Sequence, residues 1–443
     1  MIASPGSRDT AGLNRDRRDH TGSRGAIGTF ITYPSAVVND ERSWQAVFEH
    51  VVNRSHLATA GDLPGILDQA SALLEVSAEL YLVDLGQREL HPVRERGGTS
   101  LPVDATLAGR AFARVEIVVS AAEAEPAHLW VPVLDGTERL GVLRVGLPAG
   151  ADPQDRVLRA QVWALAGQVA HLVLSKQLYS DLFHRVRRTK PLSVASELLW
   201  QLLPPKVFAC ERVVIAAAME PYDQVGGDGF DYAVDDDRAY VAIFDSMGHD
   251  LHAGLTTSMA LAATRNARRC GADLVAAAEL ADDTINAHRS GELYSFATAF
   301  LAQLELDTGV LHYLNAGHPA PAVLRDGRVV RLLDTVSRTP LGLGNLHRGR
   351  PVLLREQLEP GDRVLFHTDG VTEARSPHGE LFGLERLVDL VERHEASGLP
   401  AAETLRRVVR AVLEHQDGRL QDDATLLMLE WTTTDQLSLL PAL

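Results

Sequence analysis

The stretch GGDGFDYAVDDDRAYVAIFDSMGHD, residues 226–250, holds seven aspartates and a single arginine. Apolar residues in GFDYAV and AYVAIF predict two strands, and the acidic DDD between them predicts a solvated hairpin turn. The second strand runs directly into Asp245, and Asp228 follows two glycines whose missing side chains let a backbone or an ion approach closely. So much negative charge beside buried strands requires something positive nearby.

Two distant segments also carry acids at strand ends. DRVLFHTDGVTEA leads an apolar strand to Asp369, and LQDDATLLMLEW places Asp422 and Asp423 just before the last strand. Each acid taken alone is more simply a turn residue or a helix cap. Four such sites would repel one another if they met, and a divalent cation resolves that conflict. Carboxylates, backbone carbonyls and water are ligands of Mg²⁺ and Mn²⁺, so the set favours a site for such ions.

Length and composition restrict the class of protein. A chain of 443 residues favours two domains with linkers, and 45% apolar with 23% charged residues is typical of a soluble globular protein. The net charge of −16 provides no basic field, so we expect neither nucleic acid nor a membrane as partner. The two cysteines, Cys210 and Cys270, exclude a disulfide scaffold. With no signal peptide and no apolar run of about 18 residues, we expect a cytoplasmic protein.

The first half of the chain predicts a leader followed by a small α/β module. Residues 1–28 are rich in Gly, Ser, Arg and Asp, and we interpret them as a disordered leader. Apolar residues recur at helical spacing from Glu41, and a second helix is expected over LPGILDQASALLEV. Strands are expected in ELYLVDL, VEIVVS, HLWVPVL and DGTERLGVLRVGL, before a final helix over DRVLRAQVWALAGQVAHLVLSKQLYSDLF.

This order over residues 41–176 resembles a GAF domain, a small sensory module. The resemblance rests on GTSLPVDATLAGRAFARVEIVV, LWVPVLDGTERLGVLRV and LRAQVWALAGQVAHLVL. Some GAF domains bind a small ligand and others only dimerise, and nothing in these segments names a ligand. Tyr81 and Trp130 are more simply core residues than ligand contacts.

A helical linker is expected over residues 177–205, and a second domain over 206–432. Lys190-Pro191 interrupts the linker, which predicts two helices or one kinked helix. These helices could pair with their copies in a homodimer or pack on their own chain. In the second domain, hairpins alternate with helices over 252–269, 272–289 and 383–416, which predicts an α+β fold with helices packed on sheets. A tail of residues 433–443 follows.

The motifs GGDGFDY, DSMGHD, TDGVTEA and DDATLL, in this order, resemble the metal motifs of the PPM family, the protein phosphatase 2C-like serine/threonine phosphatases. LNAGHPAP and LLPP match its bacterial SpoIIE-type branch, whose members often carry GAF or PAS sensors in front. The resemblance implies a two-layer β-sandwich flanked by helices, with two Mn²⁺ or Mg²⁺ ions. The implied ligands are a bridging Asp245, the backbone carbonyl of Ser246, Asp369 and Asp422 on the second ion, and Asp228 directly or through water.

The remaining polar residues of these motifs have simpler interpretations. Asp250 stands where the family usually has glycine, and GGDGF replaces the commoner GGDFY. Further acids are expected to form a solvated rim or hairpin: Asp231, Asp235 to Asp237, Asp250 and Asp423. His249 and His318 are candidates for protonating a leaving group or for holding a metal-bound water, although structural roles are simpler for both.

The resemblance implies a metal-dependent phosphoserine/phosphothreonine phosphatase. Water held between two dications loses its proton readily and can attack phosphorus, which agrees with the lack of a catalytic cysteine. The implied substrate is a small phosphorylated anti-sigma-factor antagonist, which would make the protein a stress or developmental regulator. The GAF-like part would regulate turnover through the helices at 176–203 and the helix after Asp250. Two alternatives remain, a non-catalytic sensory or scaffold protein with a phosphatase-like fold and a phosphatase that acts on a small metabolite.

Overall fold

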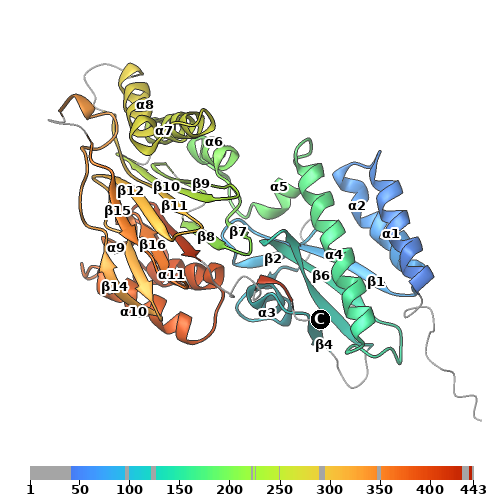
Figure 1. Ribbon diagram of the computed structural model, residues 1–443. Coiled ribbons are helices and arrows are strands. Elements are labelled where there is room, and N and C mark those ends of the chain that lie inside the picture. The colour runs from blue at the N-terminus through green and yellow to red at the C-terminus, as the bar shows by residue number, and fades with distance from the viewer. Residues whose placement is uncertain are drawn as a thin grey trace, which may run out of the picture.

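A computed structural model describes residues 41–94, 99–120, 126–220, 223–224, 226–248, 250–288, 295–346, 351–431 and 439–441 (Figure 1). The predicted leader and His249 lie outside these residues. Within them the chain forms three antiparallel sheets with helices on their faces, which confirms the mixed α+β class. The first sheet and its helices occupy one end of the molecule, and the other two sheets pack together at the other end (Figure 1).

The N-terminal unit, residues 41–187, is built on the first sheet. In sheet order its strands are β3 (Leu101–Pro102), β2 (Glu89–Pro92), β1 (Ser77–Val83), β6 (Glu138–Gly146), β5 (His128–Asp135) and β4 (Val118–Ser120). One face is covered by α1 (Glu41–Ser55), the 3-10 turn η1 (Ala60–Asp62), α2 (Leu63–Ala72) and α4 (Arg156–Gln177). The other face packs on α3 (Leu107–Arg114), where Phe112 is fully buried beside Tyr81. Tyr81 and Trp130 are in edge-to-face contact there, as expected of core residues.

Helix α4 is the long apolar element of this unit. By length and composition it could cross a membrane. Its buried residues, Leu158, Val162 and Val169 among them, instead pack in the same core as α1 and α2. The helix begins after Asp155, whose carboxylate accepts the backbone N–H groups of Val157 and Leu158. These residues therefore make α4 a core helix of the N-terminal unit.

Two short helices connect the units. The helix was predicted to end at Phe183, but α4 ends at Gln177. Residues 178–181 are not helical, and α5 (Leu182–Arg187) follows them. The break predicted at Lys190-Pro191 separates α5 from α6 (Val194–Leu202). Phe183 is buried in the first core, whereas Leu199 is buried in the core of the C-terminal unit. The linker thus packs on its own chain, and pairing in a homodimer stays a prediction.

The C-terminal unit, residues 194–431, contains two sheets that face each other. One has the order β15 (Leu354–Gln357), β12 (Val310–Ala316), β11 (Ala297–Glu305), β10 (Arg238–Ser246) and β9 (Asp228–Val234). The other has the order β14 (Arg328–Leu332), β13 (Ala322–Arg325), β16 (Arg363–His367), β17 (Ala424–Trp431), β8 (Val213–Glu220) and β7 (Val207–Ala209). Phe244 and Phe300, from the sheet of β9 to β12, share one core with Phe366 and Leu427, from the sheet that contains β16 and β17. A two-layer sandwich results, as expected.

Helices cover both outer faces of this sandwich. Helices α7 (Leu251–Arg269) and α8 (Leu274–Ala287) lie with α6 on the sheet that contains β9, β10 and β11. Helices α10 (Gly383–Ala396) and α11 (Ala401–His415) lie on the second, where they bury a separate cluster that includes Leu405 and Val409. Two single turns complete the set, η2 (Gly344–Leu346) and α9 (Asp369–Thr372). Leu439, in the predicted tail, is buried in the α10–α11 cluster.

Candidate active site

The β9–β10 hairpin brings the first two predicted acids together. In its antiparallel register Asp245 lies opposite Asp228. Opposed residues of such a ladder point their side chains to the same face, about 4.5–5.5 Å apart at Cβ. Asp235, Asp236 and Asp237 are exposed where the chain reverses, as predicted for the hairpin. Backbone pairing alone therefore forces two carboxylates to be neighbours.

Asp369 reaches the same place from the second sheet. Strand β16 ends at His367, and α9 begins at Asp369. Thr368, between them, donates a hydrogen bond from Oγ1 to Asp228 Oδ2 over 2.7 Å. The Thr368 oxygen also accepts the backbone N–H of Thr425 over 3.0 Å. One threonine hydroxyl thus joins β9, β16 and β17, and it holds Asp228 in position between the two sheets.

Asp423 has a different role from the one predicted. It was expected in a solvated rim, but it is only 4% exposed. Its Oδ2 accepts the backbone N–H groups of Gly226 and Gly227 over 2.8 and 2.9 Å, and that of Asp228 over 3.4 Å. Buried N–H groups need acceptors, and this loop finds all three in one carboxylate. Asp423 therefore fixes the loop that presents Asp228.

Asp231 was also wrongly predicted to face water. It is buried on β9, where its carboxylate pairs with Arg265 over 2.6 Å and with Arg268 over 3.2 Å. Both arginines lie on α7, so these ion pairs fasten α7 to the sheet that contains β9. Asp250 is exposed, as expected, and its carboxylate accepts the N–H groups of His252 and Ala253 at the start of α7. The family glycine is thus replaced by a helix cap.

The acids form a gradient from the interior to the surface. Asp228 and Asp423 are buried, Asp245 and Asp369 are half-buried, and Asp422 is exposed. Burial, followed by the charges of Asp369 and Asp422, raises the pKa of Asp245 to about 8, and the Asp245 and Asp369 carboxyls share a hydrogen bond. Burial, then the charge of Asp245, raises the pKa of Asp228 well above its usual range. Burial and neighbouring negative charges thus dominate the shifts of both carboxyls.

Comparison with known proteins identifies this part of the chain. Residues 235–432 match the family model of Stage II sporulation protein E (SpoIIE). The matched residues are less than half of the chain, and we call them the SpoIIE-type domain after the model that they resemble. The SpoIIE-type domain contains three of the four acidic motifs, and Asp228 lies just before the matched residues.

Two relatives and one solved structure show the range of the similarity. Protein IcfG of Synechocystis is 30% identical over 152 residues, which are 34% of this chain and 23% of IcfG. Phosphoserine phosphatase RsbU of Bacillus subtilis is 27% identical over 241 residues, which are 54% of this chain and 69% of RsbU. A crystal structure of the RsbU and RsbW domains of a Mycobacterium tuberculosis protein is 26% identical, with a TM-score of 0.43, and covers 50% of this chain and 62% of that one. The match spans less than a quarter of IcfG.

The residues of the SpoIIE-type domain fit divalent cations by their chemistry. All five acids of the cluster offer hard oxygen ligands, and the raised pKa values of Asp228, Asp245 and Asp369 indicate that a cation would be bound favourably. Among the described residues, however, no three acidic, histidine or cysteine side chains already surround one point as a metal cage would require. The carboxylates meet as neighbouring pairs. Like charges without a counter-ion resist closer approach.

Glycine is required where the loop before β9 meets the residues at the end of β10. A Cβ at Gly227 would lie 2.5 Å from the carbonyl oxygen of Ser246 and 2.7 Å from that of Gly248. The Ser246 hydroxyl hydrogen-bonds Thr257 on α7 over 2.7 Å, and Thr257 donates to the Gly227 carbonyl. Ser246, whose carbonyl is the predicted ligand, is therefore held between Gly227 and Thr257.

His318 is placed as a structural residue of the SpoIIE-type domain. Its Nδ1 lies 2.8 Å from Oγ1 of Thr298, and Thr298 is the cross-strand neighbour of Asp245. Burial lowers the pKa of His318 to about 3, so the ring is neutral near pH 7 and lacks the second proton that an imidazolium would give a leaving group. Sequence reasoning missed Thr298 and Thr368. The order His-Thr-Asp at the end of an apolar strand was the available signal for Thr368.

Proposed function

We propose that this protein is a metal-dependent serine/threonine protein phosphatase. The observation that carries the proposal is the convergence of Asp228, Asp245 and Asp369 from two facing sheets, with pKa values raised by burial and by one another's charge. The activity in the name of the relative RsbU, a phosphoserine phosphatase, supports the same reaction.

The proposed ligands of the ions are Asp228, Asp245, Asp369, Asp422 and the backbone carbonyl of Ser246. Bound Mn²⁺ or Mg²⁺ would supply a water of lowered pKa and would neutralise charge on the phosphoryl oxygens. Thr368 orients the Asp228 carboxylate through its hydrogen bond, and Asp423 keeps the preceding loop closed. The exposed position of Asp422 leaves one side of the cluster open to a substrate.

The surface beside the acids favours a protein substrate over a small metabolite. Met247, Leu251 and Leu255 are exposed apolar side chains that follow Asp245 along the chain. Such side chains offer a partner protein something to pack on, whereas a small phosphate ester needs only polar contacts. We infer that the substrate is a phosphorylated anti-sigma-factor antagonist or a similar small phosphoprotein, and that the reaction takes place in the cytoplasm. The N-terminal unit, as a GAF-like module, would regulate it.

The test is hydrolysis of phosphoserine and phosphothreonine proteins by the full chain. We expect Mn²⁺-dependent release of phosphate, lost on chelation and reduced by about a hundredfold or more in Asp245→Ala. Exposed Asp236→Ala in the hairpin is the matched control and should keep activity. Phosphate release from small esters but not from any phosphoprotein would establish the metabolite alternative. Binding of phosphoproteins without turnover would establish the scaffold alternative.

A further inference from the structure

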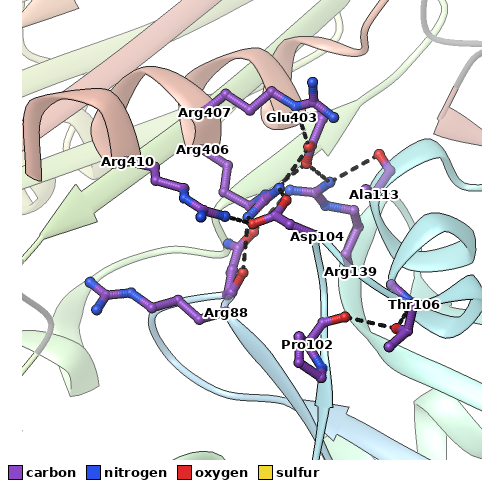
Figure 2. A network of polar contacts seen from close by, with 12 residues as sticks. Arg88, Pro102, Asp104, Thr106, Ala113, Arg139, Glu403, Arg406, Arg407 and Arg410 are labelled. Atoms are coloured by element: carbon purple, nitrogen blue, oxygen red, sulfur yellow. Dashed lines mark hydrogen bonds and ion pairs between the residues drawn. The ribbon is translucent and has the colours of Figure 1, made fainter. Parts of the chain in front are cut away.

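Charged side chains are buried where the N-terminal unit meets α11 (Figure 2). Arg139 on β6 is 3% exposed and Glu403 on α11 is fully buried, with 3.4 Å between Arg139 Nη1 and Glu403 Oε2. Arg406 donates two hydrogen bonds of 2.8 Å to Glu403. Asp104, which precedes α3, accepts from both Arg406 and Arg410. Two residues of the N-terminal unit thus hold three residues of one helix.

This network fixes one arrangement of the two units. Removing charges from water is costly, so each must meet its partner, and a sliding contact would leave some of them unpaired. Arg139 also lies over the Phe112 ring at 4.7 Å and donates to Gln87 over 2.9 Å. Glu403 is buried, which favours its neutral form, yet the hydrogen bonds and charge of Arg406, with the charge of Arg139, hold its pKa below the usual value. The Glu403 carboxylate therefore remains ionised, and the network stays charged.

The contact extends from α11 to the strand edge beside it. Arg88, just before β2, pairs with Glu220 at the end of β8 over 3.0 Å. Glu138 accepts the backbone N–H of Val207 over 2.8 Å, and Lys206 donates to the carbonyl of Leu85 over 2.9 Å. The N-terminal unit therefore grips the ends of β7 and β8 as well as α11.

Both gripped segments lead directly into the acidic cluster. Helix α11 ends at His415, and the segment that connects it to β17, residues 416–423, carries Asp422 and Asp423. Strand β8 ends at Glu220 and leads to the loop whose Gly226 and Gly227 are held by Asp423. A displacement of α11 would therefore move Asp422 and Asp423 together, and with them the support of Asp228.

We propose that the N-terminal unit controls the acidic cluster through α11, with the Asp104–Arg139–Glu403–Arg406–Arg410 network as the lock. While the lock is closed, the end of α11 is fixed and residues 416–423 are ordered. A signal that moves β6 or the segment before α3 opens the lock and loosens Asp422. This route is separate from the contact between α6 and α7. Its effect on turnover rests on the proposed function, but its effect on the order of residues 416–423 does not.

The test is backbone hydrogen exchange of the full chain after Asp104→Asn. Asp104 is 34% exposed and touches none of the acids, so the fold should survive. We expect exchange in residues 401–423 to quicken and Mn²⁺ binding, measured by calorimetry, to weaken about fivefold or more. Exchange in α7 should not change. Arg139→Met, which leaves Glu403 its bonds to Arg406, should act in the same direction.

The matched control is Asp68→Asn, which breaks the exposed pair with Arg94 inside the N-terminal unit. It should leave residues 401–423 as in the wild type. If Asp104→Asn and Arg139→Met also leave the exchange of residues 416–423 and Mn²⁺ affinity unchanged, the lock does not act on the cluster and the inference is wrong. Absence of phosphatase activity in the wild type would instead overturn the proposed function and leave the exchange result standing.

Discussion

At the scale of single residues, Thr368 and Asp423 hold the acids in place. Thr368 contacts Asp228 with its hydroxyl, and Asp423 accepts three backbone N–H groups in the loop before it. Both are buried, so each hydrogen bond is protected from competition by water. Their contribution is geometric, because they set where the Asp228 carboxylate points.

Substitution of Thr368 by valine should destabilise the protein by about 1–3 kcal/mol, because a buried carboxylate and a buried N–H each lose a partner. Urea unfolding at neutral pH measures the loss. Mn²⁺ affinity should fall in the same variant, whereas Thr368→Ser keeps the hydroxyl and should retain most of both properties. Equal stability of the valine variant and the wild type would show that the hydroxyl bonds contribute nothing.

The acids themselves predict how stability depends on pH without divalent ions. The pKa of Asp245 is raised to about 8 in the folded protein, above its unfolded value of about 4. Its contribution is fully present below about pH 4 and is lost as pH rises through about 8, because the folded state retains a proton that the unfolded chain releases. The melting temperature of the metal-free protein, in the presence of a chelator, should therefore fall across this range.

Asp245→Asn removes one of the repelling charges. At pH 8 the metal-free variant should melt above the metal-free wild type, while saturating Mn²⁺ should stabilise only the wild type, by about 2.7 kcal/mol at a hundredfold excess over its dissociation constant. Calorimetric melting with and without Mn²⁺ measures both effects. Asp236→Asn, in the exposed turn, is the control and should behave as wild type. Equal Mn²⁺ stabilisation of the Asp245 variant would remove this residue from the metal site.

At the scale of elements, the β9–β10 hairpin and the loop before β17 meet at Gly227. An added methyl group there would clash with backbone carbonyls that cannot rotate away. Gly227→Ala should cost about 1–3 kcal/mol and displace Asp228, lowering activity more than stability. Gly167→Ala in α4, where nothing lies within 4 Å of the new methyl, is the matched control and should be neutral or stabilising. Urea unfolding and Mn²⁺ titration of both variants provide the comparison.

Elements with strong periodicity were predictable, and those defined by distant partners were not. Apolar spacing predicts the α7 helix, the β9–β10 hairpin and the strands that lead to Asp245 and Asp369. Strands β2 and β3 and helix α3 were not predicted, because they are short and their formation depends on the sheet that they join. The burial of Asp231 and Asp423 escaped for the same reason, because their arginine and backbone partners come from other segments. Whether four acids surround metal ions stays a prediction.

At the scale of the whole molecule, Lys206 marks the junction between the two units. Burial lowers its pKa to about 8, with the charge of Glu138 acting in the opposite direction. The unfolded chain binds this proton up to about pH 10.5, so the group makes stability rise as pH increases from about 8 to 10.5. Lys206→Met should remove that slope, and it should destabilise the protein at pH 7 because the carbonyl of Leu85 and the carboxylate of Glu138 each lose a partner. Guanidinium unfolding at pH 7.5 and 9.5 checks the sign, and a slope that persists in the variant would contradict it.

The buried face of α11 also constrains how such proteins can be recombined. A truncated catalytic half, or a chimera carrying a foreign sensor, would leave Glu403 beside Arg406 and Arg407 with no Arg139 to complete the set. Exchanging the N-terminal unit at the linker alone would therefore leave Glu403 without Arg139. A functional graft must bring the helix surface along with its sensor, so the two halves are expected to have diversified as a matched pair.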